Sequence, residues 1–294
     1  KDRKKPKGTK ARVQAYKKRV TYIGHAIIVV IFIAIIAVSS FFLYSMLYSP
    51  PEQKPINPTL QFESENSNSQ LKAAIVDHLS LTAPNQTFIE TAVNILKQAG
   101  YTVDYYSGEK VTVEFYRNLP THDYSLIVLR VHSGTFSIGT SHMVCFFSSE
   151  LYTKTKYVLE QLTDQVGDVR FSEEETRYFG ISQNFVSMSM RETFKNATII
   201  MMGCEGLAYT TMAEAFIYKG ARAYISWNSS ISVSHTDQAT TNLLQHLILE
   251  KQTIKKSVEE AMKEVGPDPA CNSLLIYYPL EAGEQTIENI IGEN

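Results

Sequence analysis

An uninterrupted apolar stretch near the N-terminus is the strongest pattern in the 294-residue chain. Between Val20 and Pro51 there is no Asp, Glu, Lys or Arg, and residues 26–47 are almost wholly apolar. Because a helix needs about 20 residues to cross the hydrocarbon core of a bilayer, the pattern predicts a transmembrane helix over residues 21–48. A cleaved signal peptide is the alternative, but its apolar core has only about 7–15 residues. An uncleaved anchor is the preferred interpretation.

The distribution of charge gives this segment an orientation. The chain has 28 Lys and Arg against 30 Asp and Glu, but residues 1–19 hold ten basic residues and one Asp. This part therefore carries a net charge of +9, and the remainder carries −11. Basic residues close to a membrane span stay on the cytoplasmic side. Residues 1–20 are thus predicted to be a cytoplasmic tail, with the C-terminal part outside the cytoplasm.

The same basic tail has a second interpretation, which is binding to nucleic acid or to anionic lipid. Beside a predicted transmembrane helix, a topology signal that also contacts lipid is preferred. The acidic remainder excludes a uniformly basic nucleic-acid binder. We therefore expect the lipid bilayer, and no nucleic acid, among the partners of the chain, while the pattern leaves the oligomeric state open.

After the apolar stretch the pattern changes twice. Residues 49–70 contain four prolines and no apolar period, which is typical of a linker. Residues 71–294 are long enough for one domain with a substantial core. Short apolar runs there predict strands, and amphipathic stretches between them predict helices. The predicted strands are 71–79, 102–107, 123–131, 197–203 and 221–227, and the predicted helices are 85–99, 112–119, 211–220 and 235–265.

This alternation predicts an α/β fold with a mostly parallel sheet flanked by helices. Between the third and fourth strands lies an insertion, Thr135–Lys195, with weaker periodicity. It contains a strand-like segment at 143–149 and a helix-like segment at 153–162. There is no internal repeat, no GxGxxG motif and no phosphate-binding loop, which argues against the usual nucleotide folds.

Two predicted strands end in residues that carry chemistry. One runs into His132-Ser133-Gly134, and the other runs into Gly203-Cys204-Glu205. In open parallel sheets, functional groups gather beyond the carboxyl ends of adjacent strands, so a Cys/His pair is expected there. His132 would act as acid and base, Cys204 as nucleophile, and backbone N–H groups of Gly134 and Cys204 would bind an oxyanion. The alternative is that Cys204 is a small buried residue and His132 a satisfied polar one.

These strand-end motifs resemble those of the caspase-like cysteine peptidases, which include caspases, legumain, clostripain and gingipain. Their shared pattern is a hydrophobic strand ending in His-Gly and a second one ending in a small residue and Cys. The resemblance spans roughly residues 72–265 and implies a caspase-like fold with a Cys204/His132 dyad. In this family Gly directly follows the His, whereas here Ser133 intervenes, so the oxyanion hole is expected to be shifted.

The resemblance also implies a substrate pocket. Met202 stands two residues before the cysteine, and Trp227 and Asn228 stand where caspases have the Trp and Arg of Ser-Trp-Arg. Met202 supplies neither charge nor amide, and Asn228 lacks the charge that would select an acidic P1 residue. Asp77, at the end of the first strand, has two interpretations: it favours a basic P1 side chain, or it caps a turn, which is the commoner role.

The remaining polar clusters give weaker indications. No histidines have metal-ligand spacing, so neither a metal nor another cofactor is expected. Glu173–Glu175 has the pattern of a solvated acidic turn, without the alternation of a calcium loop. Cys145 and Cys271 either pair in an oxidising compartment or are separate thiols. Three acceptor sequences for N-glycosylation are present, at Asn85, Asn196 and Asn228.

Three hypotheses follow from these patterns. The first is a single-pass membrane-anchored cysteine endopeptidase that acts on a peptide or protein substrate outside the cytoplasm. The second is a non-catalytic domain of the same fold that serves as a binding or scaffold module. The third is an unrelated α/β receptor domain with a ligand pocket lined by residues 77–80 and 228–234.

Overall fold

The computed structural model describes residues 71–138, 141–170 and 176–292. The predicted cytoplasmic tail, transmembrane helix and linker, and the acidic turn Glu173–Glu175, lie outside these residues. Within the described ranges, every helix is too short or too polar to cross a bilayer. The domain predicted from residue 71 onward is therefore the part to which the following description applies.

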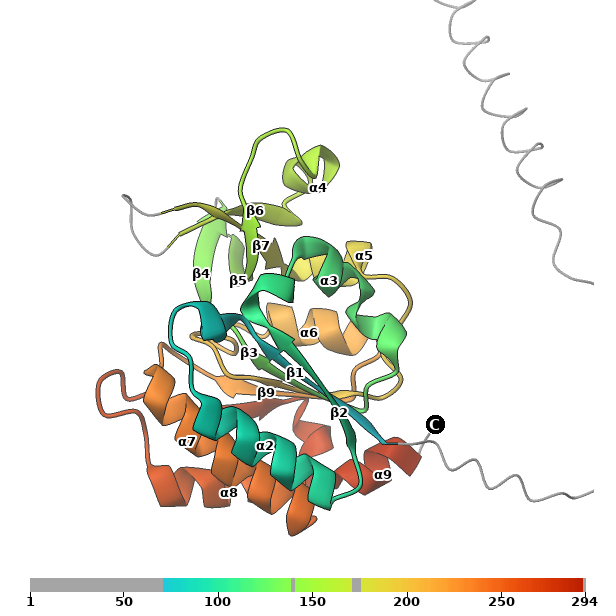
Figure 1. Cartoon of the computed structure of the whole chain (residues 1–294), viewed down its shortest axis with the longest axis vertical. Coiled ribbons are helices and arrows are strands. Elements are labelled where there is room, and N and C mark those ends of the chain that lie inside the picture. The colour runs from blue at the N-terminus through green and yellow to red at the C-terminus, as the bar shows by residue number, and fades with distance from the viewer. Residues whose placement is uncertain (1–70, 139–140, 171–175, 293–294) are drawn as a thin grey trace, which may run out of the picture. The chain divides into compact units, whose positions relative to one another are not determined.

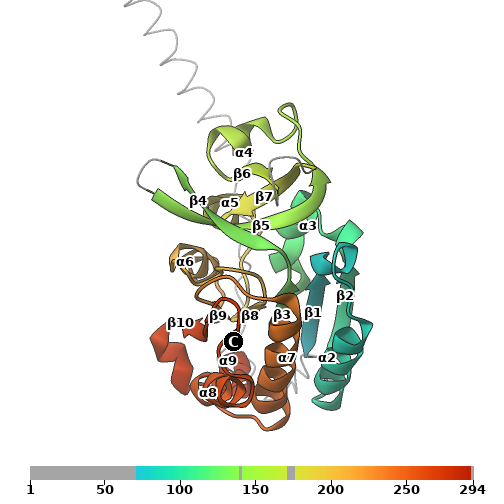
Figure 2. The same cartoon turned by 90° about the vertical axis from the view of Figure 1, so that its left-hand side faces the viewer.

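A six-stranded sheet forms the centre of this part, and helices cover both of its faces (Figures 1 and 2). Its strand order is β10-β9-β8-β3-β1-β2, and all neighbours are parallel except the pair β9 and β10. The mostly parallel sheet predicted from the sequence is thus confirmed. The strands are β1 (Lys72–Asp77), β2 (Thr102–Ser107), β3 (Leu126–Arg130), β8 (Thr198–Met201), β9 (Ala223–Trp227) and β10 (Leu275–Tyr278).

The central strands are buried on both faces, which is why their sequences are continuous apolar runs. Alternate residues of β3 belong to two separate cores: Ile127 and Leu129 pack on one face of the sheet, and Leu126 and Val128 on the other. The first face is covered by α3 (Val113–Asn118), α5 (Gln183–Ser189) and α6 (Thr211–Tyr218), and the second by α2 (Gln86–Gln98), α7 (Val233–Leu244), α8 (Ile254–Val265) and α9 (Ile287–Gly292).

Local signals place the ends of α2 as predicted. The Asn85 side chain accepts a hydrogen bond from the backbone N–H of Phe88, which caps the N-terminus of the helix. Gly100 follows the helix with φ +86°, a conformation that glycine adopts without strain. The side chain of Asn85 also donates to Asp237, so this sequon asparagine is used inside the fold.

The single long helix predicted over 235–265 is wrong. The chain instead forms α7, a π-helical turn at Gln245–Leu249, and then α8. Lys251 lies between the helices with φ +54°, and the side chain of Thr253 caps the start of α8. Because α7 and α8 pack against each other, both apolar faces reach the same core, which one straight helix of this length would not allow.

The insertion forms a second, antiparallel sheet beyond the first (Figure 1). Its order is β4-β5-β7-β6, and its strands are β4 (Ser133–Ile138), β5 (Ser141–Leu151), β6 (Val166–Val169) and β7 (Tyr178–Ser182). Only β5 was predicted from the sequence. The helix-like segment contributes a single short helix, α4 (Val158–Leu162). Phe146 and Phe179 bury this sheet against the core that also contains α3 and α5.

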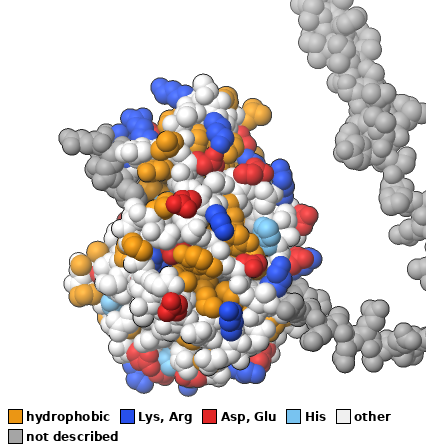
Figure 3. Space-filling view, in the orientation of Figure 1, with side chains coloured by type: hydrophobic (Ala, Val, Ile, Leu, Met, Phe, Trp, Pro, Cys, Tyr) orange, Lys and Arg blue, Asp and Glu red, His pale blue; other side chains and the backbone are white. Residues whose placement is uncertain are grey.

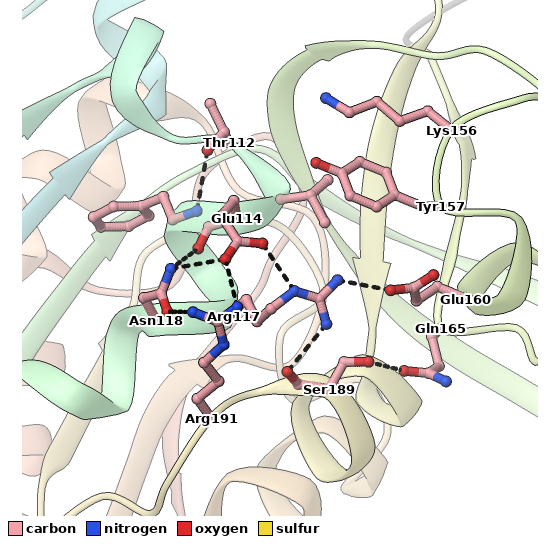
Figure 4. A network of polar contacts seen from close by, with 12 residues as sticks. Thr112, Glu114, Arg117, Asn118, Lys156, Tyr157, Glu160, Gln165, Ser189 and Arg191 are labelled. Carbon is pink, nitrogen blue, oxygen red and sulfur yellow. Dashed lines mark hydrogen bonds and ion pairs between the residues drawn. The ribbon is translucent and has the colours of Figure 1, made fainter.

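Arg117 of α3 joins the short helix α4 of the insertion to α5 (Figure 4). Its guanidinium contacts the Glu114 carboxylate at 3.0 Å, the Glu160 carboxylate at 2.7 Å and the Ser189 carbonyl at 3.3 Å. Glu160 belongs to α4 and Ser189 to α5, so one side chain joins three elements.

On the face drawn in Figure 3, basic and acidic side chains are interspersed, and the described residues of this face show no large region of one sign.

Candidate active site

The ends of β3 and β8 bring His132 and Cys204 to the same level of the sheet. These strands are parallel neighbours, and their last paired residues are Leu129 and Met201, so His132 and Cys204 each follow three residues later. Beyond the last paired residues the two segments stay in contact, because the Ser133 hydroxyl donates a hydrogen bond to the Cys204 carbonyl. The segments that follow β3 and β8 are therefore adjacent at Ser133 and Cys204.

Gly203 makes this close approach possible. A Cβ atom at this position would lie 2.3 Å from the Val131 carbonyl oxygen and 2.4 Å from the Ser133 hydroxyl oxygen. Neither neighbour has room to move away easily, since one is backbone and the other is hydrogen-bonded to Cys204. The glycine before the cysteine is thus required by the packing of the two strand ends.

The imidazole of His132 is half-buried and turned toward the segment that follows β1. Its Nε2 lies 2.9 Å from the Thr82 hydroxyl, and its ring meets that of His78 edge to face at 5.8 Å between centroids. Burial, then the nearby His78 and Arg130, lower the pKa of His132 from 6.5 to about 4. His132 is therefore a neutral imidazole at neutral pH, the form that can accept a proton.

The thiol of Cys204 is turned toward the segment that follows β9. Its Sγ lies 3.4 Å from the Ile231 backbone nitrogen and 3.6 Å from the Ile231 carbonyl oxygen. Burial raises the pKa of this thiol, the Ile231 backbone partly offsets that rise, and the Glu205 carboxylate and Cys271 raise it further. At neutral pH the two side chains are therefore a neutral thiol and a neutral imidazole.

The backbone N–H groups of Ser133 and Gly134 are directed to opposite sides of β4. The backbone carbonyl of His132 accepts a hydrogen bond from the Phe147 N–H at 2.9 Å, so His132 and Phe147 are a hydrogen-bonded pair of the antiparallel ladder. Because hydrogen-bonded and non-bonded pairs alternate in an antiparallel ladder, the Gly134 N–H is directed toward its β5 partner Cys145. The Ser133 N–H is directed away from β5, as is that of Thr135, which binds Glu205 at 3.0 Å. The alternation therefore places the Ser133 N–H on the side of β4 where Thr135 binds Glu205, and the Gly134 N–H on the β5 side.

Asp77 is not open to a substrate. It is buried, and its carboxylate lies 2.8 Å from the Arg130 guanidinium, which also binds Asp237 through two hydrogen bonds of 2.7 and 2.8 Å. The Tyr105 hydroxyl donates to the second Asp77 oxygen at 3.1 Å. Asp77 has no side-chain capping bond to the turn that follows it. Its role is to neutralise a buried arginine, which neither interpretation from the sequence anticipated.

The other three residues predicted to line a pocket also have structural contacts. Met202 and Trp227 are buried in the core formed with α2, α7 and α8. The Trp227 indole donates to the Thr236 hydroxyl at 2.9 Å. Asn228 is exposed, and its side-chain oxygen accepts from the Leu274 N–H at 2.8 Å, next to the start of β10. The half-buried Cys204 packs against the same core as Met202 and Trp227, whereas Asn228 is exposed.

Several residues near the dyad were missed by sequence reasoning. Thr82 contacts the imidazole, and Ile231 contacts the thiol. The carboxylate of Glu205 binds the hydroxyl of Thr135 at 2.7 Å and that of Ser230 at 3.2 Å. The acidic residue directly after the cysteine was visible in the sequence, but its partners come from strand β4 and from the loop after β9, and no local pattern identifies them.

The remaining titratable groups do not form a metal site within the described residues. All three cysteines are free thiols, so the Cys145–Cys271 pairing left open by the sequence is not formed. Cys145 is buried in the second sheet, where burial raises its pKa to about 12, whereas Cys271 is exposed. Cys204 is thus the half-buried thiol among the three.

Comparison with known proteins gives similarity in structure alone, since no family model and no curated protein matches the sequence. The crystal structure of the Arg-specific cysteine proteinase gingipain R is 13% identical with a TM-score of 0.42, covering 75% of this chain and 45% of that one. The Drosophila initiator caspase Dronc is 9% identical with a TM-score of 0.38, covering 82% of this chain and 95% of that one. The chain thus spans less than half of the gingipain structure. The α/β class of the domain follows from its own strand order and the helices on both faces of the sheet.

Proposed function

We propose that the chain is a membrane-anchored cysteine endopeptidase of caspase-like fold, with Cys204 as nucleophile and His132 as general acid and base. The observation that supports this proposal is that β3 and β8 are adjacent parallel strands, and that His132 and Cys204 follow their carboxyl ends in the sequence. The resemblance of both strand-end motifs to those of the caspase-like peptidases supports the same assignment.

The charge state of the pair defines the first step. As the Cys204 sulfur attacks the peptide carbonyl carbon, its proton passes to the neutral His132. The Thr82 hydroxyl lies 2.9 Å from Nε2 of this imidazole, so we assign to Thr82 the role of orienting the ring that takes the proton. The carbonyl oxygen becomes an oxyanion, to which the Ser133 N–H is the proposed donor.

The second half of the reaction returns the proton. His132 protonates the leaving amine as the C–N bond breaks, which releases the first product and leaves a thioester on Cys204. Water then attacks the thioester carbonyl and gives a proton to His132, and the resulting acid leaves as Cys204 regains its proton. The whole cycle consumes one water for each peptide bond.

The location of this activity is part of the proposal. The apolar residues 21–48 would anchor the chain in the bilayer with the basic residues 1–20 in the cytoplasm. The domain from residue 71 would then act on peptides or proteins outside the cytoplasm. A protease-protection assay on sealed right-side-out vesicles that contain the full chain tests this arrangement. Added protease should digest the domain, whereas a domain on the cytoplasmic side would survive.

A specific observation favours the alternative of a binding or scaffold module. His132 and Cys204 are turned toward different loops, and the sulfur contacts the Ile231 backbone. If these contacts persist when a peptide binds, the residues stabilise strand ends and perform no catalysis. The two functions therefore differ in whether the thiol reacts with the assistance of His132.

Thiol labelling of the full chain separates them. A peptide-based electrophile should label Cys204 in the wild type, and His132→Ala should slow that labelling at neutral pH by at least about 10-fold. Cys271→Ala is the matched control, because Cys271 is exposed whereas Cys145 is too buried to report on access. Cleavage of a peptide library by wild type but not by Cys204→Ala completes the test. Equal labelling of Cys204 and Cys271, independent of His132, contradicts the peptidase proposal.

A further inference from the structure

Strand β4 holds the segment that carries the nucleophile through two successive side chains of one face. The Ser133 hydroxyl binds the Cys204 carbonyl. Two residues further along, the N–H and hydroxyl of Thr135 bind one Glu205 oxygen at 3.0 and 2.7 Å. The other Glu205 oxygen accepts from the Ser230 hydroxyl at 3.2 Å. We call these four residues, Ser133, Thr135, Glu205 and Ser230, the latch.

Glu205 is the centre of the latch and has an unusual backbone. Its φ is +60°, in the left-handed region that non-glycine residues rarely adopt. Its N–H donates to the Ser229 carbonyl at 2.9 Å, so backbone and side chain both bind the loop after β9. The carboxylate therefore bridges β4 on one side of Cys204 and the Ser229–Ser230 loop on the other. Such a conformation persists where the surrounding contacts determine it.

The negative charge of Glu205 makes ionisation of the Cys204 thiol less favourable. An adjacent carboxylate disfavours the thiolate, and the pKa of Cys204 is raised in part by Glu205. The other groups that act on the sulfur are Cys271, which raises its pKa, and the Ile231 backbone, which lowers it. His132 lies beyond the end of the neighbouring strand, β3, and His78 and Arg130 are the groups that act on it. A residue that opposes thiolate formation must contribute in another way if the site is catalytic.

We propose that Glu205 is a positioning residue, which uses the latch to hold the Cys204 backbone against β4 in the geometry needed for attack on a peptide. This inference rests on the proposed peptidase function. It also makes β4, and through it the second sheet, a mechanical support of the nucleophile. A change in the position of that sheet would then alter the placement of Cys204 without any contact to the thiol.

The latch predicts that reactivity and turnover change in opposite directions when Glu205 loses its charge. In the full chain, Glu205→Gln should make alkylation of Cys204 by iodoacetamide about 3-fold faster or more at neutral pH, since the pKa of the thiol falls. The same variant should lower kcat on a peptide substrate by about 10-fold with KM nearly unchanged. Thr135→Val should lower kcat with less effect on alkylation. Glu259→Gln, an exposed carboxylate of α8, is the matched control.

Two results would overturn the proposal. One is a Glu205→Gln variant with wild-type kcat, and the other is a parallel loss of kcat, alkylation rate and thermal stability, which indicates general damage to the fold. If the wild type cleaves no peptide, the peptidase proposal fails by itself. The latch is then decided by hydrogen exchange at residues 203–206, which Glu205→Gln should accelerate by about 10-fold or more. Unchanged exchange there excludes the latch.

Discussion

Arg130 and Asp237 form a bidentate ion pair in the interior, with Nε–Oδ1 and Nη2–Oδ2 distances of 2.7 and 2.8 Å. Asp77 binds the third guanidinium nitrogen, and the Ala83 carbonyl accepts from Nη2 at 2.9 Å. The cluster joins the ends of β1 and β3 to α7. Arg130, which ends β3, stands two residues before His132 in the chain. It therefore fixes the strand end from which the imidazole projects.

Loss of this arginine should strongly destabilise the fold. Arg130→Leu leaves two carboxylates buried without a cation, for which we expect a loss of about 3–5 kcal/mol in the free energy of unfolding. Arg191→Met is the control, because its pair with Glu114 is largely exposed and such pairs contribute about 0–1 kcal/mol. Denaturant unfolding of both variants measures the difference. Equal losses would show that the buried cluster does not determine stability.

The low pKa of His132 predicts an acid limit of activity near pH 4. A base with a pKa of about 4 keeps its lone pair down to that pH, whereas an ordinary histidine loses it near 6.5. The value of kcat/KM should therefore stay level from neutral pH down to about 5. His78→Phe removes one group that lowers the pKa of His132, so the acid limit should move upward. An acid limit near 6.5 in the wild type would contradict the burial of the imidazole.

The same shifts make stability depend on pH with a definite sign. His78 and His132 each have a pKa of about 4 in the folded state against an ordinary 6.5. Between these values the unfolded chain binds more protons, so these two groups make the folded state less stable as the pH falls from 6.5 toward 4. His78→Phe should make the unfolding midpoint less dependent on pH in this window.

Strands β1, β3, β8 and β9 were predictable because they are largely apolar runs, whereas strand β10 was not predicted. The residues that follow β3 and β8 in the sequence were enough to place His132 and Cys204 just beyond strand ends. The partners of those residues were not predictable. Arg130 interrupts an apolar run and binds carboxylates 53 and 107 positions away, so no local pattern links them. The second sheet was missed because β6 and β7 are short and contain Gly167 and Gly180. The break after α7 was missed because the apolar period continues through it.

Thr82 should act through the orientation of His132. Its hydroxyl contacts Nε2, so Thr82→Val removes a polar partner while keeping the shape of the side chain. We expect kcat to fall by about 10-fold with little change in KM, because the imidazole samples unproductive orientations. Thr82→Ser retains the hydroxyl and should recover most of the activity. If Ser and Val behave alike, the contact has no role in turnover.

Substitution by alanine should reduce stability and activity at Gly203 but leave both nearly unchanged at Gly134. Gly203→Ala would place a Cβ 2.3 Å from the Val131 carbonyl, so the strand ends must separate. We expect a loss of about 1–3 kcal/mol in the free energy of unfolding, together with loss of activity as Cys204 moves away from His132. Gly134→Ala places its Cβ where no other atom lies within 4 Å, and it should be tolerated. Because its N–H is directed toward β5, Gly134→Ala should also keep kcat near the wild-type value. A large loss of kcat in Gly134→Ala with unchanged stability would instead return the oxyanion role from Ser133 to Gly134.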